Sequence, residues 1–345
     1  MLSKRFRNDQ KPVEKLNPLQ LQMKKEVEEK INSSEYLFEN TACCVCQGSD
    51  FETLSEKDRY GFHLPVVICT QCGLIQIHPK LSQKSYNDFY HKIYRKLYLG
   101  EEVPGKKFFD SQKRTGDGII EFLERRLDQK IEHRNILEIG AGAGGILYSF
   151  RERGNEVYGC DLDREYLEFG KNEYGINIEY GPVDALNADF RPDIIIYSHV
   201  LEHTLDPVAE LKRLKSVCQD HTLVYIGVPG IRALQDNYDS DFLKYIHIAH
   251  VYHFTLATLT NVLNKAGFGL VYGNEDINCI CRPSDKDRDT PPVNDYENEI
   301  AFLKKMECAR YFPARSKFKT HIEPWIIITL KKTGLYDMAK KHYKK

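Results

Sequence analysis

The sequence predicts an α/β protein with a doubly wound, parallel sheet, preceded by a small cysteine-rich module and followed by a helical extension. Between about residues 107 and 282, short apolar segments alternate with helix-compatible segments of 10 to 15 residues, and a glycine-rich turn follows the first apolar segment. Such alternation is typical of a parallel sheet covered by helices on both faces. Two C-x-x-C pairs upstream of this region indicate a separate small module.

Each apolar segment of this region is bounded by turn residues or by an amphipathic segment, which sets the expected elements. The expected strands are 135–140, 156–163, 176–181, 192–199, 222–230, 269–276 and 277–282. The expected helices are 118–127, 145–154, 164–175, 206–218 and 254–268.

Composition excludes several classes of protein. The 345 residues contain 49 Lys and Arg against 50 Asp and Glu, so the net charge of -1 gives no general attraction for nucleic acid. The first residues lack the apolar core of a secretion signal, and no stretch approaches the roughly 18 apolar residues of a membrane span. We therefore expect a cytoplasmic protein of about two domains.

Four regions are expected along the chain. Residues 1–40 form a charged helical leader in which no core begins, and residues 41–106 form the cysteine module with an aromatic helix. Residues 107–282 form the α/β domain, and residues 283–345 form a helical extension with a basic end. In the aromatic helix, a tyrosine recurs every four residues, at Tyr86, Tyr90, Tyr94 and Tyr98, so the four phenols share one stripe. This stripe is interpreted as packing between domains, with a platform for a sugar as the alternative.

The glycine turn carries the first binding signal. It contains Gly140, Gly142 and Gly144 after Glu138, and its glycines are more closely spaced than those of the dinucleotide-binding fingerprint. The carboxylate of Glu138 favours a cationic or zwitterionic ligand. Asp161 ends the next strand, where a carboxylate accepts hydrogen bonds from two ribose hydroxyls. Asp184 follows the third strand, near the expected position of an adenine.

With these residues in this order, the region from 107 to 282 resembles the class I S-adenosylmethionine-dependent methyltransferases. The resemblance implies a Rossmann-like, seven-stranded sheet and a cofactor whose amino acid part lies against the glycine turn. The residues it implies for the cofactor are Glu138, Gly140, Ala141, Gly142, Gly144, Asp161, Leu162, Asp184, Ala185 and Ser198, with Asp163 and Val183 as neighbours that could share these tasks. The alternative is a doubly wound domain that binds another nucleotide or none.

Three later segments narrow the resemblance. They are YSHVLEHTLDP (197–207), VPG (228–230) and IHIAHVYHF (246–254), which together look like methyltransferases of bacterial polysaccharide, sugar and secondary-metabolite pathways. The resemblance implies a small-molecule acceptor, here a hydroxyl of a sugar or of a metabolite of glycan biosynthesis. Many methyltransferases that act on amino groups have a motif here of Asn or Asp followed by two prolines and an aromatic residue. This motif is absent, and Ser198 and His199 occupy its position.

Methyl transfer to a hydroxyl needs a group that removes its proton, and a histidine suits this task. The candidates are ranked with His250 first, then His253 and His199, because all lie in segments expected at the open end of the sheet. His203 is equally compatible with catalysis and with bracing a loop through Glu202. Tyr238 and Tyr245 are weaker candidates for contact with the substrate.

The pairs Cys43/Cys46 and Cys69/Cys72 have the spacing of a four-cysteine zinc site, with 22 residues between them. Some members of the family named above carry an N-terminal zinc module ending in C-x-x-C-G-L, which CTQCGL resembles. Such a zinc would be structural, holding a lid over the acceptor site. Free buried cysteines are the alternative, and Cys44 competes as a ligand.

Further alternatives remain open from the sequence. The acceptor atom could be carbon or nitrogen of a nucleotide sugar, the substrate could be a phosphorylated or lipid-linked glycan, and the chain could be a zinc- and nucleotide-binding protein without turnover. The basic C-terminus is interpreted as a packed helix with a solvated lysine tail, with contact to an anionic membrane as the alternative. The sequence does not determine the oligomeric state.

Overall fold

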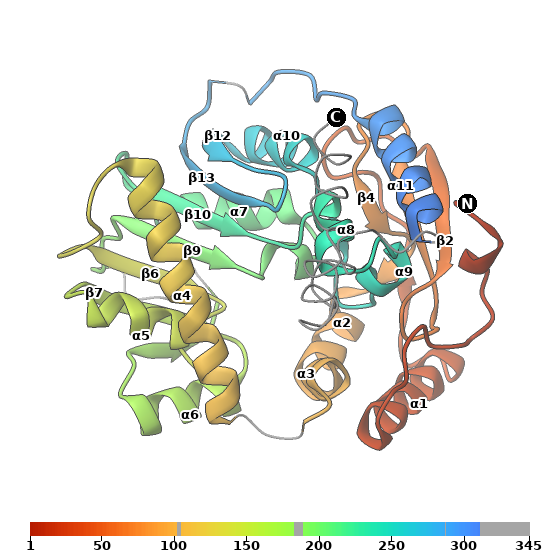
Figure 1. Ribbon diagram of the computed structural model, residues 1–345, viewed down its shortest axis with the longest axis horizontal. Coiled ribbons are helices and arrows are strands. Elements are labelled where there is room, and N and C mark those ends of the chain that lie inside the picture. The colour runs from red at the N-terminus through yellow and green to blue at the C-terminus, as the bar shows by residue number, and fades with distance from the viewer. Residues whose placement is uncertain (102–104, 183–188, 287, 311–345) are drawn as a thin grey trace, which may run out of the picture.

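A computed structural model describes residues 1–101, 105–182, 189–286 and 288–310 (Figure 1). The expectations for Val183, Asp184 and Ala185, and for the basic end after residue 310, lie outside the described residues. Among the residues that are described, no helix is both long and apolar enough to cross a membrane.

A sheet of seven strands forms the centre of the α/β region and has the expected strands in a doubly wound order. From edge to edge the strands are β12 (Phe268–Gly273), β13 (Asn278–Pro283), β10 (Leu223–Gly227), β9 (Ile194–Ser198), β6 (Asn135–Ile139), β7 (Glu156–Asp161) and β8 (Ile178–Tyr180). Only β13 runs against its neighbours in this sheet, since its pairings with β10 and β12 are antiparallel and the others are parallel. The Rossmann-like fold predicted from the sequence is therefore confirmed.

Both faces of the sheet are covered because successive side chains of a strand point to opposite faces. Ile136 and Ile196 belong to one apolar cluster, and their chain neighbours Leu137 and Ile195 belong to another. The helices of the region are α4 (Lys106–Leu127), α5 (Gly145–Glu152), α6 (Arg164–Tyr174), α7 (Pro207–Lys215) and α10 (Leu256–Ala266). Helices α4 and α5 pack together on the first face, and α7 and α10 pack together on the second (Figure 1).

The cysteine-rich module contains an antiparallel sheet in the order β11-β4-β3-β2. Its strands are β2 (Phe51–Lys57), β3 (His63–Cys69), β4 (Ile75–Ile77) and β11 (Tyr252–His253). The last of these comes from the α/β region, after β10, so the two regions complete one sheet together. A single apolar cluster includes residues of both, such as Val66 and Ile226.

The N-terminal residues contribute to this core, which corrects the expectation that no core begins before residue 40. Phe6 is fully buried against Phe242, and Arg5 forms ion pairs with Asp241 and Glu307. Met23, Val27 and Tyr36 are buried in the same core, but these few apolar side chains are scattered among charged residues, so the sequence pattern did not reveal the role. The remaining elements are η1 (Lys4–Phe6), α1 (Pro18–Asn32), β1 (Phe38–Glu39), β5 (Lys80–Leu81), η4 (Leu201–His203), η5 (Ile231–Ala233), α8 (Leu234–Asn237), α9 (Phe242–Tyr245) and α11 (Tyr296–Arg310).

The tyrosine stripe lies on a helical segment with a π-helical turn at its centre, formed by α2 (Gln83–Phe89), η2 (Tyr90–Tyr94) and α3 (Arg95–Leu99). The expected stripe is confirmed: Tyr90 and Tyr94 stack with ring centroids 4.9 Å apart, and Tyr86 and Tyr98 continue the row. We call residues 83–99 the aromatic segment.

Candidate cofactor and acceptor sites

The glycine turn between β6 and α5 adopts a conformation that requires its glycines. Gly140, Gly142 and Gly144 have φ values of 74°, 56° and 76°, in the left-handed region that side chains disfavour. A Cβ atom on Gly140 would lie 2.5 Å from Cγ2 of Val200, in the loop after β9. The turn and that loop are therefore in close contact at the carboxyl ends of neighbouring strands, where open α/β sheets bind their ligands.

Gln112 of α4 holds the turn, a role that the sequence analysis missed. Its Oε1 accepts hydrogen bonds from the backbone N–H groups of Ala143 (3.2 Å) and Gly145 (3.3 Å), and its Nε2 donates to the carbonyl of Ala141 (3.0 Å). One side chain thus fixes three backbone groups of the turn. Nothing in the sequence around residue 112 indicates this contact, because Gln112 lies on the helix before the first strand of the sheet and reaches the turn only in the folded structure.

Glu138 lies at the end of β6 with 1% of its surface exposed. Burial raises the pKa of its carboxyl well above the ordinary value, and the nearby charge of Asp161 adds to the effect. Its Oε2 has no hydrogen-bond partner among the described residues. A buried acceptor without a donor costs free energy, so the position favours a ligand that carries a positive charge or an N–H group.

Asp161 closes the other side of the turn. Its carboxylate accepts from the backbone N–H groups of Gly142 and Asp163, each at 2.7 Å. Burial raises the pKa of Asp161, while Arg95 and these two amides act against the rise. A carboxylate has further lone pairs, so Asp161 can still accept from a ligand hydroxyl.

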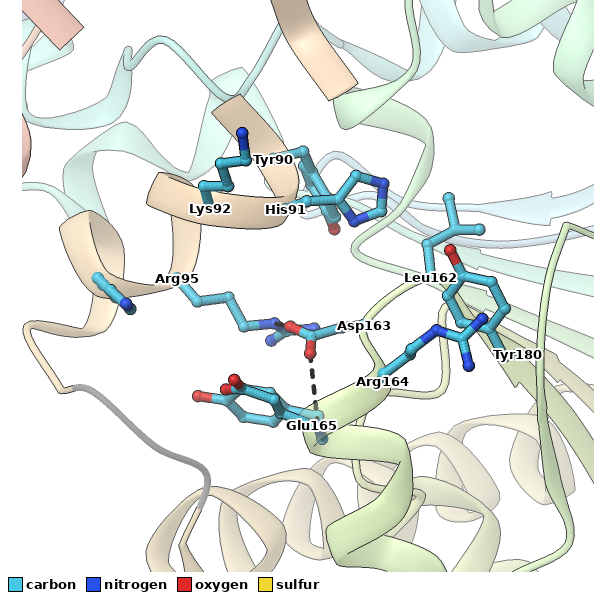
Figure 2. Close-up of a pocket in the computed structure, with 11 residues that line it drawn as sticks. Tyr90, His91, Lys92, Arg95, Leu162, Asp163, Arg164, Glu165 and Tyr180 are labelled. Atoms are coloured by element: carbon cyan, nitrogen blue, oxygen red, sulfur yellow. Dashed lines mark hydrogen bonds and ion pairs between the residues drawn. The ribbon is translucent and has the colours of Figure 1, made fainter. Parts of the chain in front are cut away.

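A cavity of about 380 Å³ lies beside this carboxylate (Figure 2). One wall is the aromatic segment, with Tyr90, His91, Lys92, Arg95 and Lys96. The other wall contains Leu162 and Asp163 after β7, Arg164, Glu165 and Tyr166 at the start of α6, and Tyr180 at the end of β8. Arg95 closes one end by donating from Nε to Asp163 at 2.7 Å. The cavity therefore places Leu162 and Asp163, two residues expected near the ribose, on its lining.

A second polar cluster lies where β9 ends, after the buried Ser198, and Glu202 is at its centre. Oε1 of this carboxylate lies 3.3 Å from Nδ1 of His199, 3.9 Å from Nε2 of His203 and 3.9 Å from Nε2 of His250. The residue is 1% exposed, and neither carboxylate oxygen has a hydrogen-bond partner among the residues described. Three of the four predicted base candidates thus meet at one carboxylate that the sequence analysis treated only as a brace.

The histidines of this cluster differ in accessibility. The side chain of His199 is 61% exposed, whereas those of His203 and His250 are 7% and 8% exposed. Surrounding protein lowers the pKa of His199, but the Glu202 carboxylate outweighs it and raises the pKa above the ordinary value. Burial lowers the pKa of His203 and His250. The fourth candidate, His253, lies deeper behind His250, and burial lowers its pKa to about 3.

The aromatic segment covers this cluster. The rings of Tyr94 and His203 lie 5.1 Å apart, and those of Tyr98 and His247 lie 5.6 Å apart. Tyr86 also donates to the carbonyl of Ala249 at 2.9 Å. The tyrosines therefore pack directly on the histidines. Tyr245, a weaker candidate for substrate contact, is buried and bonded to the carbonyl of Pro229.

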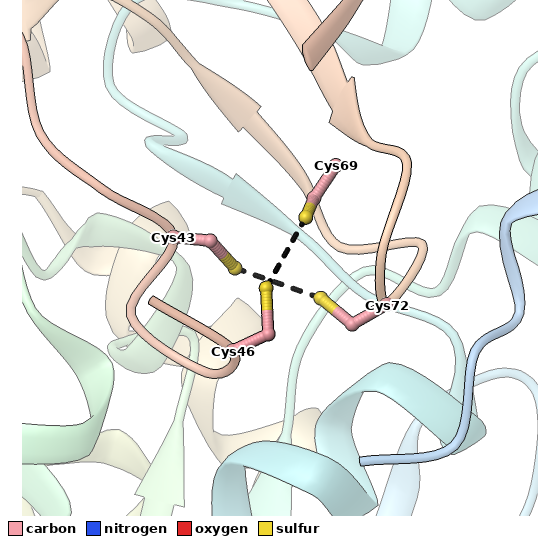
Figure 3. A group of neighbouring side chains, drawn as sticks. All are labelled: Cys43, Cys46, Cys69 and Cys72. Atoms are coloured by element: carbon pink, nitrogen blue, oxygen red, sulfur yellow. Dashed lines mark hydrogen bonds between the residues drawn. The ribbon is translucent and has the colours of Figure 1, made fainter. Parts of the chain in front are cut away.

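The two C-x-x-C pairs form a third cluster (Figure 3). The Sγ atoms of Cys43 and Cys72 lie 3.5 Å apart and those of Cys46 and Cys69 lie 3.4 Å apart, while all four fall within 4.8 Å of one another. These separations are too long for disulfides and close to the roughly 3.8 Å that four sulfurs at 2.3 Å from a tetrahedral zinc would have. Gly48 donates its N–H to Sγ of Cys46 at 3.4 Å, as expected for a knuckle. Cys44 is not a member of the group found in the described part of the chain.

Comparison with known proteins agrees with this arrangement. Residues 111–272 match the model of a family described as a methyltransferase domain. Together with the strand order and the glycine turn, this decides the class. The chain contains a class I S-adenosylmethionine-dependent methyltransferase domain. A comparison with curated proteins found no match.

Among solved structures, the methyltransferase domain is similar to magnesium protoporphyrin IX methyltransferase from Synechocystis PCC 6803, with 16% identity and a TM-score of 0.43 over 59% of this chain and 100% of that one. It is also similar to 1,6-didemethyltoxoflavin-N1-methyltransferase from Burkholderia thailandensis, with 18% identity and a TM-score of 0.44 over 63% and 98%. A third is a methyltransferase from Clostridium acetobutylicum, with 14% identity and a TM-score of 0.40 over 58% and 99%.

Proposed function

We propose that the protein transfers a methyl group from S-adenosylmethionine to a hydroxyl of a sugar or of a metabolite of glycan biosynthesis. The observation that carries the proposal is the pair of His199 and Glu202 at the carboxyl end of β9, because Val200, which lies between them in the chain, is adjacent to the glycine turn. A basic group next to a cofactor turn is the arrangement that proton removal from an acceptor needs.

The cofactor would occupy the space between the glycine turn and the cavity beside Asp161. When bound, it supplies an electrophilic methyl group on a sulfonium. The unpartnered carboxylate oxygen of Glu138 suits the amino group of its amino acid part, and Gly140, Gly142 and Gly144 allow close approach of that part. Asp161 would accept from the ribose hydroxyls, with Leu162 against the sugar. Ala141 and Ser198 complete the contacts from the neighbouring strand ends.

His199 is the base that we favour from this cluster. Its side chain is the accessible one, and Glu202 lies where a third group orients a catalytic histidine. His250, His253 and His203 are deeply buried, so a substrate reaches them less readily. His199 also has φ of 54° at a residue with a side chain, and such strained backbone is concentrated at functional sites.

The walls of the cluster support a polar, ring-shaped acceptor. Tyr94 and Tyr98 present aromatic faces beside His203 and His247, and aromatic faces combined with hydrogen-bonding imidazoles suit a sugar, which has both apolar C–H and hydroxyl groups. The same base could act on a carbon next to a carbonyl group, so the position of the new methyl group in the product distinguishes O- from C-methylation.

We also propose that the four cysteines bind a structural zinc ion. Four thiolates at tetrahedral distances leave no open position on the metal, which assigns it to folding rather than to methyl transfer. Protein purified without added zinc is expected to contain one equivalent, and Cys72→Ser is expected to lose it. A wild-type metal content far below one equivalent would refute the assignment.

The proposed base is tested by His199→Ala with labelled S-adenosylmethionine and a panel of nucleotide sugars and glycan extracts. Proton removal by a positioned base contributes about 10²–10⁴-fold, so the variant should lose that factor in turnover while binding S-adenosylhomocysteine as the wild type does. His221→Ala is the matched control, since that histidine is 67% exposed and pairs with Asp193 instead. Full activity of His199→Ala on the methylated substrate would overturn the assignment.

A further inference from the structure

We propose that Glu202, His203 and His250 form a second metal site, which binds a divalent transition-metal ion within the buried cluster after β9. The inference goes beyond the proposed function, which does not include a metal ion at this cluster. It is tested by metal binding, which does not depend on methyl transfer. It rests on the geometry of three buried ligands, on the orientation of one imidazole and on a buried carboxylate that faces imidazole nitrogens, of which Nδ1 of His199 is the nearest at 3.3 Å.

The carboxylate of Glu202 is the first part of the argument. It is 1% exposed, and neither oxygen has a hydrogen-bond partner in the described part of the chain. An uncompensated buried carboxylate is among the most costly groups in a protein interior. The groups that point to it are imidazole nitrogens, and these compensate the charge only if they carry protons or share a cation with it.

His203 is held so that its second nitrogen has no proton to give. Its Nδ1 lies 2.9 Å from the carbonyl oxygen of Ala249, and since a carbonyl only accepts, Nδ1 must be the donor. In the neutral ring Nε2 therefore carries a lone pair, which faces Oε1 of Glu202 at 3.9 Å and lies 3.5 Å from the hydroxyl of Tyr94. The Tyr94 hydroxyl can satisfy the imidazole but leaves the carboxylate uncompensated, whereas a cation between the two acceptors satisfies both. A backbone carbonyl that fixes the other ring nitrogen is also the usual support of a metal-ligating histidine.

His250 supplies the third ligand from a separate loop. Its Nε2 lies 3.9 Å from the same Oε1, and its ring lies 4.8 Å from the ring of His203, nearly perpendicular to it at 77°. The ligand atoms of the three residues all lie within 4.8 Å of one another. Ligand atoms of a tetrahedral ion at about 2.1 Å lie about 3.4 Å apart, so each imidazole nitrogen, now 3.9 Å from Oε1, must move about 0.5 Å closer to the carboxylate when the ion binds.

The backbone keeps the three ligands together. The N–H of Val251 donates to the carbonyl of Glu202 at 2.8 Å, which ties the loop of His250 to the 3-10 turn of Glu202 and His203. Two neutral imidazoles and one carboxylate favour Zn²⁺, Mn²⁺ or Fe²⁺ over Ca²⁺ or Mg²⁺, which prefer oxygen ligands alone. Three protein ligands also leave positions on the ion open to further ligands.

The test uses the full-length protein with its cysteine site already filled with zinc. Mn²⁺ is added stepwise, and electron paramagnetic resonance measures the concentration of Mn²⁺ that remains free. Mn²⁺ prefers nitrogen and oxygen ligands, so it reports the second site and does not displace zinc from thiolates. The wild type is expected to bind one Mn²⁺, and Glu202→Gln and His250→Ala are each expected to weaken this binding at least tenfold. His253→Gln is the matched control, because it removes a buried imidazole from β11, the strand that follows the loop of His250, without removing a proposed ligand.

A second measurement does not depend on variants. Co²⁺ added to the zinc-filled wild type should give the visible d–d bands of nitrogen and oxygen ligation without an added thiolate charge-transfer band. Retention of the zinc equivalent in each variant shows that it has folded. Failure of the zinc-filled wild type to bind one further metal ion, whether Mn²⁺, Co²⁺ or Zn²⁺, would overturn the proposal, as would unchanged affinity in the two ligand variants. Equal loss of binding in His253→Gln would also contradict it, since the effect would not be specific to the three ligands.

Discussion

Removal of the Gln112 side chain tests whether the cofactor turn is held from α4. The amide makes three hydrogen bonds, to the N–H groups of Ala143 and Gly145 and to the carbonyl of Ala141. In Gln112→Ala these three backbone groups lose their side-chain partner. The turn still contains its glycines, but the conformation that would receive the amino acid part of the cofactor is no longer fixed before binding.

The size of the effect follows from the contacts. A neutral hydrogen bond contributes about 1 kcal/mol, and these have lengths of 3.0 to 3.3 Å, so the three together contribute about 2–3 kcal/mol. If about half of this appears in binding, the dissociation constant of S-adenosylhomocysteine rises roughly tenfold. Isothermal titration calorimetry measures that change, and thermal unfolding measures the part that appears in stability.

Ser111→Ala is the control, because Ser111 is the exposed neighbour of Gln112 on α4 and its backbone carbonyl, which the substitution keeps, is the group that accepts from Thr115. It should leave both quantities unchanged. Wild-type affinity together with a wild-type unfolding temperature in Gln112→Ala would refute the reasoning, since the three bonds would then contribute nothing. A loss of stability without a loss of affinity would limit the role of Gln112 to folding.

Two further predictions concern the turn and the aromatic segment. Gly140→Ala should destabilise the fold by about 1–3 kcal/mol and abolish measurable cofactor binding in calorimetry. The reason is that the left-handed backbone at residue 140 disfavours a side chain and that the new Cβ atom would collide with Val200. Unchanged cofactor binding would contradict this. Burial of Asp88 opposes its ionisation, but hydrogen bonds from Lys30, Lys92 and Tyr36 lower its pKa to about 2 from the ordinary 3.8. Its ionised form therefore stabilises the fold fully above about pH 4, and this contribution is lost as the pH falls from about 4 through about 2. Asp88→Asn should lower the free energy of unfolding by about 2 kcal/mol at pH 7 and by progressively less below pH 4. Urea unfolding at several pH values measures this, and a difference from the wild type that does not change with pH would contradict it.

The elements of the α/β region could be predicted because their signals are local. The strand at Ile136 and Leu137 reads as a buried strand since both of its faces are covered, and the glycines of the turn are required by their own backbone angles. The spacing of Cys43, Cys46, Cys69 and Cys72 likewise predicts a cluster, because each pair lies on one short turn.

The cluster around Glu202 could be predicted only in part, because its geometry depends on contacts between distant segments. The histidines were identified from their segments, but the central position of Glu202 arises only when the loop of His250 folds back on the turn after β9. Gln112 and Arg95 were missed for the same reason. Each lies on a helix whose own pattern indicates packing, and each reaches the cofactor turn or its neighbouring loop through tertiary structure alone.

The cysteine cluster and the cluster around Glu202 are connected through the backbone, so the N-terminal module supports the loop that carries His250. Cys72 lies in the turn that leads into β4, and β4 pairs with β11 through Ile75 and His253. At the end of β4, the N–H of Ile77 donates to the carbonyl of Val251, whose own N–H donates to Glu202. A metal that fixes the cysteine turn therefore fixes the register of β4, and β4 in turn positions the loop that carries His250. Loss of that metal should disturb the cluster around Glu202 before it disturbs the glycine turn, because the glycine turn is held separately by Gln112 of α4.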